Sequence, residues 1–409
     1  FWLKPSAQGR NRDPQPSEAP PAPAITAMGR RGVCGTLCSA CVFCVLPVLV
    51  VPLACAVGWL CTQTVPEGVF FATLFAVMGG HLPATIFGSY SDPGIDDMAA
   101  GAVPEARPAG ELFLQMPSGA RMPANGIGMC CRPLAYNPES VRRTVLWFLL
   151  QGGRHIDDAD AYWNHQAVGG AMREAEALGV PRSEVFLTTK LLPSFFGSES
   201  VNATVHRFLA ELGADYIDLV LMHAPSHPLG RFGECKGKSW KVCRQETWQA
   251  LSALRDSGKI RDIGVSNFNV RQMDEIRLLN SAPIAANQIM FHPWADQWQR
   301  DAVQYCHKHG IAVTAYSSLG GFLEKARPET VVTLKGIADA KGKTISLVLL
   351  RWALQKNVSV IPGTSNPRHM RENLGVYGFE LTGDEVARLD ALHSDPNALK
   401  LFGMPEDQT

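Results

Sequence analysis

Short apolar runs alternate with longer amphipathic stretches through the second two thirds of the chain. We expect seven of these runs to be buried strands, and the alternation admits a short eighth: 155–159, 185–189, 216–222, 260–265, 284–289, 311–315, 358–361 and then 376–379. Between the runs, apolar residues recur at helical spacing, as in 200–212, 246–257 and 344–355. About eight β/α units predict an α/β fold of the (β/α)8, or TIM-barrel, type, because an open sheet needs fewer units.

A β-hairpin is expected before the first barrel strand. Two short apolar segments, 112–116 and 121–127, flank a Pro-Ser-Gly turn. The Gly-Ile-Gly sequence at 126–128 lies in this hairpin and not between a strand and a helix, so it gives no sign of a Rossmann turn. We assign residues 111–400 to the barrel and residues 401–409 to a C-terminal tail.

The part of the chain before the barrel divides into three segments of different composition. Residues 1–31 are rich in Pro and Ala and contain several Arg, and we expect them to be a disordered leader. Residues 32–88 are apolar, and their most hydrophobic part, 42–60, is long enough to cross a bilayer. A weaker apolar segment follows at 69–87, so one or two transmembrane or signal helices are predicted. Residues 89–110 are expected to be a linker.

Three arrangements of these apolar segments remain open. With two crossings, the barrel and the basic N-terminus would lie on the same side, which is the cytosol by the positive-inside tendency. With one crossing, the barrel would lie on the opposite side. The apolar segment could also be a signal or organelle-targeting leader that starts at Met28. We expect a membrane-associated protein with a cytosolic catalytic domain, and organelle targeting is the alternative.

The balance of charges excludes one class of partner. The chain of 409 residues carries 38 basic and 38 acidic side chains, a formal net charge of +0. Its second half has no basic stripe with interleaved aromatic residues. A nucleic-acid partner is therefore not expected.

The cysteines are unevenly placed. Six of the eleven lie in or beside the apolar segment, and the others are scattered over the barrel, which is not the pattern of a disulfide framework. Cys235 and Cys243 could pair across one loop, but we expect free thiols and a reducing compartment. The spacing within 34–44 resembles an iron–sulfur pattern, but soft cysteine side chains also suit a membrane helix, and no metal site is predicted.

Four polar residues stand at or just past the ends of predicted strands, and they are Asp157, Tyr162, Lys190 and His223. In parallel α/β folds, chemistry collects at the carboxyl ends of the strands. Tyrosine has an ordinary pKa of about 10, and a nearby ammonium group lowers that pKa. Lys190 could supply the ammonium group, Asp157 could pair with it, and His223 could orient a substrate oxygen.

Such a set suits the reduction of a carbonyl group. Tyr162 could donate a proton to the carbonyl oxygen as it becomes an alkoxide. The hydride must come from a cofactor, because no side chain can provide one. Taken singly, each residue also has a structural explanation, for example an Asp–Lys pair that only stabilises the fold.

The motifs around these residues resemble those of the aldo-keto reductase family, over most of residues 111–400. His-Ile-Asp-Asp-Ala-Asp-Ala-Tyr at 155–162 is similar to the family's H-I-D-T-A-x-x-Y, with Asp158 where Thr is usual. Phe-Leu-Thr-Thr-Lys at 186–190 resembles the strand that carries the family's lysine. Further motifs in order along the chain lie at 218–223, 264–268, 287–289 and 314–317.

The resemblance implies an NAD(P)H-dependent reductase of small aldehydes or ketones with a monomeric barrel. It implies that Tyr162 is the general acid, that Lys190 lowers its pKa, that Asp157 pairs with Lys190, and that His223 orients the carbonyl. The implied cofactor contacts are Ser266, Asn267 and Gln288 at the nicotinamide carboxamide, Tyr316 on the ring, Ser317, Leu319 and Gly321 along the pyrophosphate, and Glu372 and Asn373 at the adenine.

One departure from the family affects the choice of cofactor. Many members have I-P-K-S where this chain has Ile-Pro-Gly-Thr at 361–364, so Gly363 replaces a lysine that would contact the 2′-phosphate. Thr364 and Arg368 could still bind that phosphate. We therefore expect NADPH as the cofactor and leave NADH open. A second function also stays open, because a protein of this fold could be a cofactor-sensing regulatory subunit of a membrane complex.

Overall fold

The computed structural model describes residues 103–394, apart from 131–136, 228 and 321–327. The predicted leader, the apolar segment at 32–88, most of the linker and the tail at 401–409 lie outside the described residues. Among the helices that are described, none is both long enough and apolar enough to cross a membrane.

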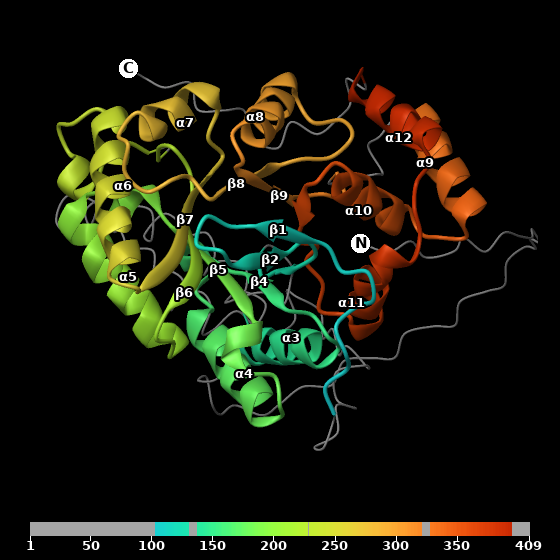
Figure 1. The fold of residues 1–409 in the computed structure, drawn as a ribbon, viewed down its shortest axis with the longest axis horizontal. Helices are drawn as coiled ribbons and strands as arrows, with labels where there is room; N and C mark the ends of the chain where they lie inside the picture. Colours follow the sequence, from blue (N-terminus) through green and yellow to red (C-terminus); the bar gives the residue numbers. More distant parts are fainter. Residues whose placement is uncertain (1–102, 131–136, 228, 321–327, 395–409) are drawn as a thin grey trace, which may run out of the picture. The chain divides into compact units, whose positions relative to one another are not determined.

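The described residues form a parallel barrel of eight strands whose order in space follows their order in the chain (Figure 1). The strands are β3 (Ile127–Gly128), β4 (His155–Asp157), β5 (Phe186–Leu191), β6 (Ile217–Met222), β7 (Ile260–Ser266), β8 (Ala286–Met290), β9 (Ala312–Tyr316) and β10 (Ser359–Val360). A parallel bridge between Asn125 and Val360 joins the two ends of the sheet. There, Gly126 N donates to Val360 O at 2.8 Å and Val360 N donates to Ala124 O at 2.8 Å. The predicted (β/α)8 barrel is confirmed.

The eighth strand is not the one that the sequence pattern suggested. Residues Gly375–Gly378 form a 3₁₀ helix, η6, and the segment 127–128, expected in the hairpin, is instead the first barrel strand. Its glycine is required by close packing, because a Cβ on Gly128 would lie 2.7 Å from the carbonyl oxygen of Ile361. The Gly-Ile-Gly sequence therefore closes the barrel.

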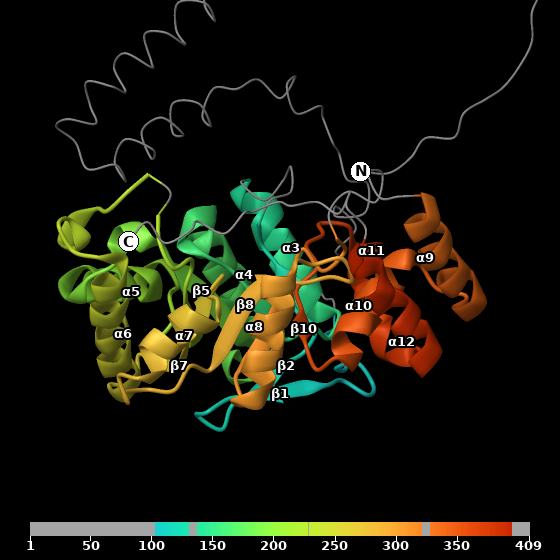
Figure 2. The ribbon, with the colours of Figure 1, turned by 90° about the horizontal axis from the view of Figure 1, so that it is seen from above.

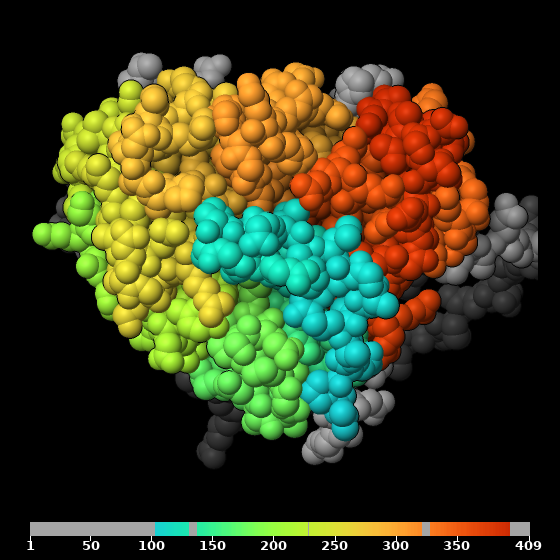
Figure 3. All heavy atoms as spheres, in the orientation of Figure 1, coloured from blue at the N-terminus to red at the C-terminus, as the bar shows by residue number. Residues whose placement is uncertain are grey.

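A two-stranded hairpin covers one end of the barrel. Strands β1 (Phe113–Gln115) and β2 (Arg121–Pro123) pair antiparallel, as predicted. They lie at one end of the barrel strands (Figure 2), and their segment crosses the middle of the face seen in Figure 3. Apolar residues of the hairpin pack with strand residues in one buried cluster, and Ser118 N donates to Asp262 Oδ1 at 3.0 Å. Because this end is closed by apolar packing, the polar chemistry lies at the other end of the strands.

Helices surround the strands, and several of them begin at a residue whose side chain caps the helix. The described helices are α3 (Pro138–Leu150), α4 (His165–Ala177), α5 (Ser198–Leu212), α6 (Trp240–Asp256), α7 (Val270–Arg277), α8 (Gln297–Lys308), α9 (Pro328–Lys341), α10 (Ile345–Gln355), α11 (Pro367–Leu374) and α12 (Gly383–Asp390). Helix α6 begins earlier than the predicted residue 246, because Ser239 caps it by accepting from Val242 N at 3.3 Å.

The expectation of free thiols in the barrel is wrong for Cys235 and Cys243. Cys235, the last residue of the 3₁₀ helix η4 (Gly233–Cys235), forms a disulfide with Cys243 in α6, and their Cα atoms are 5.6 Å apart. A tight turn followed by the first turn of a helix folds the chain between them, residues 236–242, back on itself. Cysteine usage therefore no longer argues for a reducing compartment.

Candidate active site

The structure brings the four predicted catalytic residues together at the carboxyl ends of three neighbouring strands. Asp157 is the last residue of β4, Lys190 lies in β5, and His223 follows β6 directly. Tyr162 is the last residue of a 3₁₀ helix, η1 (Asp160–Tyr162), which follows β4. Parallel pairing sets these strands in register, with Lys190 beside Leu221, so residues far apart in the sequence meet at one end of the sheet.

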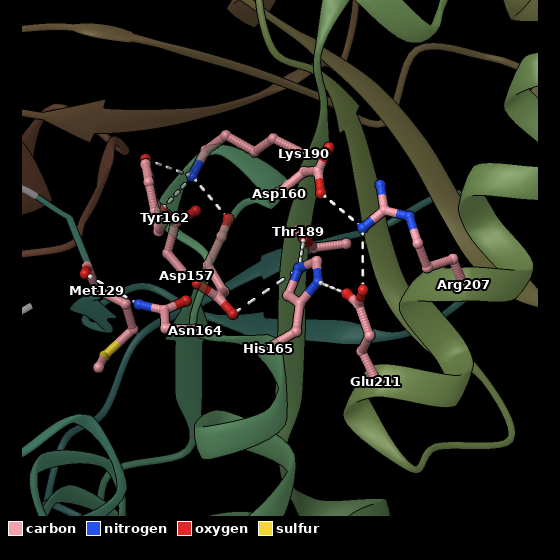
Figure 4. A network of polar contacts seen from close by, with 11 residues as sticks. Met129, Asp157, Asp160, Tyr162, Asn164, His165, Thr189, Lys190, Arg207 and Glu211 are labelled. Atoms are coloured by element: carbon pink, nitrogen blue, oxygen red, sulfur yellow. Dashed lines mark hydrogen bonds and ion pairs between the residues drawn. The ribbon is translucent and has the colours of Figure 1, made fainter. Parts of the chain in front are cut away.

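The ammonium group of Lys190 is the centre of this cluster (Figure 4). It donates to Asp157 Oδ1 at 2.5 Å, to the backbone oxygen of Asp158 at 2.9 Å and to the hydroxyl oxygen of Tyr162 at 3.2 Å. The other carboxylate oxygen of Asp157 accepts from Gln288 Nε2 at 2.6 Å. Lys190 and Asp157 are both buried, so each charge depends on the other for its stabilisation.

Burial and neighbouring charges together raise the pKa values of both Lys190 and Tyr162. Burial by itself lowers the pKa of Lys190, but the Asp157 carboxylate and the Tyr162 hydroxyl outweigh it, so the pKa of Lys190 lies above its ordinary value. Burial raises the pKa of Tyr162, and Lys190 offsets only part of this rise. The expected lowering by Lys190 is therefore present, but the net pKa of Tyr162 is above its ordinary value and the phenol keeps its proton at neutral pH.

His223 is a neutral imidazole beside the phenol. Its ring lies edge-on to the ring of Tyr162, with the centroids 6.0 Å apart. Burial and the charge of Lys190 lower the pKa of His223 to about 3. Its Nδ1 atom is inaccessible to water and finds no hydrogen-bond partner among the described residues. A neutral imidazole carries one N–H donor and one acceptor nitrogen, so the half-buried His223 can hydrogen-bond to a bound molecule.

The four predicted nicotinamide contacts lie on the neighbouring strands β7, β8 and β9 or just past their ends, and they bond to one another. Ser266 Oγ donates to the backbone oxygen of Gln288 at 2.8 Å, and Asn267 Nδ2 donates to Ser266 Oγ at 3.1 Å. The half-buried Tyr316 donates its hydroxyl proton to Asn267 Oδ1 at 2.8 Å. Asn267 has a φ of 62°, a left-handed conformation that asparagine adopts more readily than most residues. These residues form one polar group beside the Lys190 cluster, which Gln288 joins through Asp157.

The loop after β9 makes a tight turn, and the glycine in this turn, Gly320, has no room for a side chain. Ser317 has a φ of 50° and is exposed, and Leu319 is half-buried. Gly320 has a φ of 72°, and a Cβ at this position would lie 1.8 Å from Cζ2 of Trp294. Gly321, which was predicted to contact the pyrophosphate, lies outside the described residues.

The remaining predicted cofactor residues lie in α11 or just before it. Thr364 and Asn373 line one small hollow together with Asn125. The buried Oδ1 of Asn125 has no hydrogen-bond partner in the described part of the chain, so a polar acceptor is available there. Arg368 is exposed, whereas Glu372 already accepts a hydrogen bond from Thr344 Oγ1 at 2.6 Å.

A protein-family comparison decides the family. The model of the aldo/keto reductase family matches residues 126–394, which is the barrel without its hairpin. The chain belongs to the aldo/keto reductase family. It is therefore an NAD(P)-dependent oxidoreductase that reduces the carbonyl group of an aldehyde or ketone.

Curated relatives of this reductase include mammalian, bacterial and protozoan proteins. Aldo-keto reductase family 1 member A1 of Mus musculus is 33% identical over 292 residues, which cover 68% of this chain and 88% of the relative. An aldo-keto reductase of Mycolicibacterium vanbaalenii is 37% identical over 271 residues, covering 66% of this chain and 88% of the relative. A 9,11-endoperoxide prostaglandin H2 reductase of Trypanosoma cruzi is 35% identical over 278 residues, with 68% and 90% covered.

Solved structures of aldo-keto reductases share the fold of this reductase. The aldo-keto reductase of Bombyx mori in complex with NADP has a TM-score of 0.62 at 30% identity, covering 70% of this chain and 93% of that one. An aldo/keto reductase of Brucella melitensis has a TM-score of 0.59 at 31% identity, covering 69% of this chain and 99% of that one.

The reductase also contains a partly buried polar network that the sequence analysis missed. His165, Glu211 and Arg207 join Asp158 and Asp160 behind the turn that carries Tyr162 (Figure 4). The only signal in the sequence was Asp158, which stands where the family has a threonine. His165 and the two residues of α5 lie outside the family motifs that were compared, so nothing local linked them to the site.

Proposed function

We propose that this reductase uses Tyr162 as the proton donor to the carbonyl oxygen of a small aldehyde or ketone. The proposal rests on the hydrogen bonds of Lys190, whose ammonium group donates both to Asp157 and to the hydroxyl oxygen of Tyr162. As negative charge develops on the phenolate oxygen during proton transfer, the ammonium group 3.2 Å away stabilises it. Asp157 keeps the ammonium group charged and in place.

His223 orients the substrate in this mechanism. Its pKa of about 3 keeps the imidazole neutral near pH 7. A neutral imidazole carries one N–H, which donates a hydrogen bond to the carbonyl oxygen beside the Tyr162 hydroxyl. With two donors on one oxygen, the carbonyl is polarised and its carbon is exposed to attack. Bound NAD(P)H supplies the hydride.

A substrate screen tests the proposed activity. The full chain, supplied with NADPH, should turn over at least some members of a panel of short, aromatic and sugar-derived aldehydes and ketones, monitored by loss of cofactor absorbance. Firm cofactor binding without turnover on any carbonyl would instead support a cofactor-sensing subunit.

We also propose NADPH as the cofactor, with NADH as a usable substitute. The NADP complex of the Bombyx mori enzyme supports the proposal. The chemistry of the side chains fits such a molecule: amide and hydroxyl groups on Ser266, Asn267 and Gln288 suit a carboxamide, and Tyr316 offers an aromatic face. For the pyrophosphate and adenosine part of the cofactor, the proposed contacts are Ser317, Leu319, Gly321, Thr364, Arg368, Glu372 and Asn373.

The choice between the two cofactors can be changed at one exposed position. Because Gly363 offers no cation, wild-type enzyme should show similar KM values for NADPH and NADH. Gly363→Lys should lower the KM for NADPH about tenfold, the scale of one charge-assisted hydrogen bond, and leave the KM for NADH unchanged. Steady-state kinetics with both cofactors measures this. Gly336→Lys is the control, because it adds the same charge on α9, where nothing lies within 4 Å of a Cβ. A hundredfold preference of the wild type for NADPH would contradict the inference.

We further propose that residues 42–60, and with them 69–87, attach the enzyme to a membrane with the barrel in the cytosol. The sequence supports this, since no charged residue occurs between Gly32 and Pro66. After an alkaline carbonate wash, the full chain should remain with the membrane pellet, whereas residues 105–409 should stay in the supernatant. A full chain released by carbonate would exclude an integral anchor. Light scattering on residues 105–409 would test the expected monomer.

A further inference from the structure

A network of polar side chains, buried at its centre, joins the residues next to Tyr162 to helix α5 (Figure 4). His165, the first residue of α4, lies at its centre and is buried. One ring nitrogen, Nδ1, is 2.9 Å from Glu211 Oε2, and the other, Nε2, is 2.8 Å from Thr189 Oγ1. The same Nε2 is 3.9 Å from Asp158 Oδ2, and Asp158 is fully buried. The imidazole therefore lies between two carboxylates that come from different elements.

The network also fixes the short helix that carries the tyrosine. Asp160 opens η1, and its Oδ1 pairs with Arg207 Nη1 at 2.9 Å. The same nitrogen of Arg207 contacts Glu211 Oε1 at 3.0 Å. Tyr162 closes η1, so the phenol is two residues from an ion pair with α5. Helix α5 thus contacts the chain on both sides of Tyr162. Its Arg207 pairs with Asp160 before the tyrosine, and its Glu211 bonds to His165 after it.

Asp158 connects this network with Lys190 through its own backbone. Its N–H donates to Thr188 O at 2.9 Å, and its carbonyl oxygen accepts from Lys190 Nζ at 2.9 Å. Its carboxylate faces the Asn164 amide, which, with its nitrogen turned toward Asp158, donates to the two oxygens at 2.5 Å and 3.2 Å. A displacement of this side chain therefore shifts the carbonyl group that helps to hold the ammonium group.

We propose that Asp158 and His165 are positioning residues that hold Tyr162 and Lys190 in their reactive arrangement through an anchor on α5. This inference rests on the proposed role of Tyr162 as proton donor. It does not follow from family membership, because the family resemblance implies a threonine at the position of Asp158. A threonine could hydrogen-bond to His165, but it could not attract a charged imidazole.

The arrangement makes the reaction sensitive to pH near neutrality. Asp158 and His165 are surrounded by charged and titratable groups from four elements. These groups are Asp157 on β4, Lys190 on β5, Asp160 and Tyr162 on η1, and Arg207 and Glu211 on α5. Burial raises the pKa of the Asp158 carboxyl to about 6. Burial alone lowers the pKa of His165, but Glu211 and the nearby aspartates outweigh it and raise that pKa above its ordinary value. As the pH falls through about 6, Asp158 is neutralised while His165 keeps its charge, so their attraction is lost.

The test compares Asp158→Asn and His165→Gln with the wild-type full chain, using 4-nitrobenzaldehyde and NADPH from pH 5 to pH 8. Wild-type kcat should decline as the pH falls through about 6. Asp158→Asn should lower kcat about tenfold at pH 7.5, in line with a small misplacement of reacting groups, and should remove the decline near pH 6. KM and the NADPH Kd, measured by fluorescence, should not change. Wild-type rates and an unaltered pH profile in both variants would overturn the proposal.

A third variant, at a less buried position, tests the proposal even if Asp158→Asn and His165→Gln prevent folding. Glu211→Gln acts at the half-buried end of the network and keeps the shape of the side chain, but removes a charge from His165. It should lower kcat and alter the pH profile while NADPH binding persists. Glu174→Gln is its control, since Glu174 also lies on a helix and pairs with an arginine of a neighbouring helix, outside the network. A profile that is the same in Glu211→Gln, Glu174→Gln and wild type would also overturn the proposal.

The experiments distinguish an error in the positioning role from an error in the proposed proton donor. If Tyr162→Phe retained turnover, the donor would be wrong and the positioning role would fall with it. If Tyr162→Phe lost turnover while Asp158→Asn and Glu211→Gln kept both rate and profile, only the positioning role would be wrong.

Discussion

Tyr162→Phe is expected to lower kcat for carbonyl reduction by about 10²- to 10⁴-fold, the usual contribution of a positioned general acid. The variant keeps the aromatic ring that lies edge-on to His223 and loses only the hydroxyl that Lys190 contacts. Folding and cofactor binding should therefore be preserved. Stopped-flow single-turnover kinetics with saturating NADPH, together with a titration of cofactor fluorescence, separate the chemical step from binding.

A second tyrosine provides the control for this experiment. Tyr305 on α8 also has its hydroxyl in hydrogen bonds with charged neighbours, accepting from Arg277 Nη1 at 2.7 Å and donating to Asp274. Tyr305→Phe should leave kcat at the wild-type value because the hydroxyl is remote from the Lys190 cluster. Full turnover in Tyr162→Phe would show that another group delivers the proton.

Lys190→Met should reduce both stability and activity. The substitution leaves the Asp157 carboxylate buried with Gln288 as its remaining partner, and removing one member of a buried ion pair typically costs about 3 to 5 kcal/mol. It also removes the positive charge that stabilises a phenolate at Tyr162, so kcat should fall about as far as in Tyr162→Phe. Chemical unfolding monitored by circular dichroism and steady-state kinetics on the folded fraction measure the two effects separately.

An exposed ion pair provides the matched control. Lys335 pairs with Asp339 at 3.0 Å one helical turn away, but both side chains are about two-thirds exposed, at 66% and 65%. Lys335→Met should change the unfolding midpoint very little, since exposed pairs contribute little to stability. Equal loss of stability in the two variants would contradict the view that desolvation of Asp157 is the source of the effect.

The sequence predicted the repeating architecture well because its signals are local. Alternation of apolar runs and amphipathic stretches identified seven of the eight barrel strands, since each signal lies within one element. The strand at 127–128 was assigned to the hairpin because it is only two residues long and lies next to β2. Its role is set by contact with Val360 and Ile361 at the far end of the domain, which no local pattern reveals.

The candidate site was predictable in its residues but not in its environment. Asp157, Tyr162, Lys190 and His223 could be named because they follow strands and match family motifs. The net rise in the pKa of Tyr162 could not be predicted, since it depends on how completely the folded chain removes water from the phenol. The same holds for the disulfide between Cys235 and Cys243, which depends on the path of one loop.

By itself, the sequence predicted the barrel, seven of its eight strands, the family and the four polar residues at the strand ends. Periodicity and motif spacing are properties of neighbouring residues, and these features depend on little else. Only the tertiary structure decided which segment closes the barrel and that Asp158, His165, Glu211 and Arg207 form one network behind Tyr162. Those features depend on contacts between elements far apart in the chain and on the loss of water around buried charges, which arise only when the strands and helices pack.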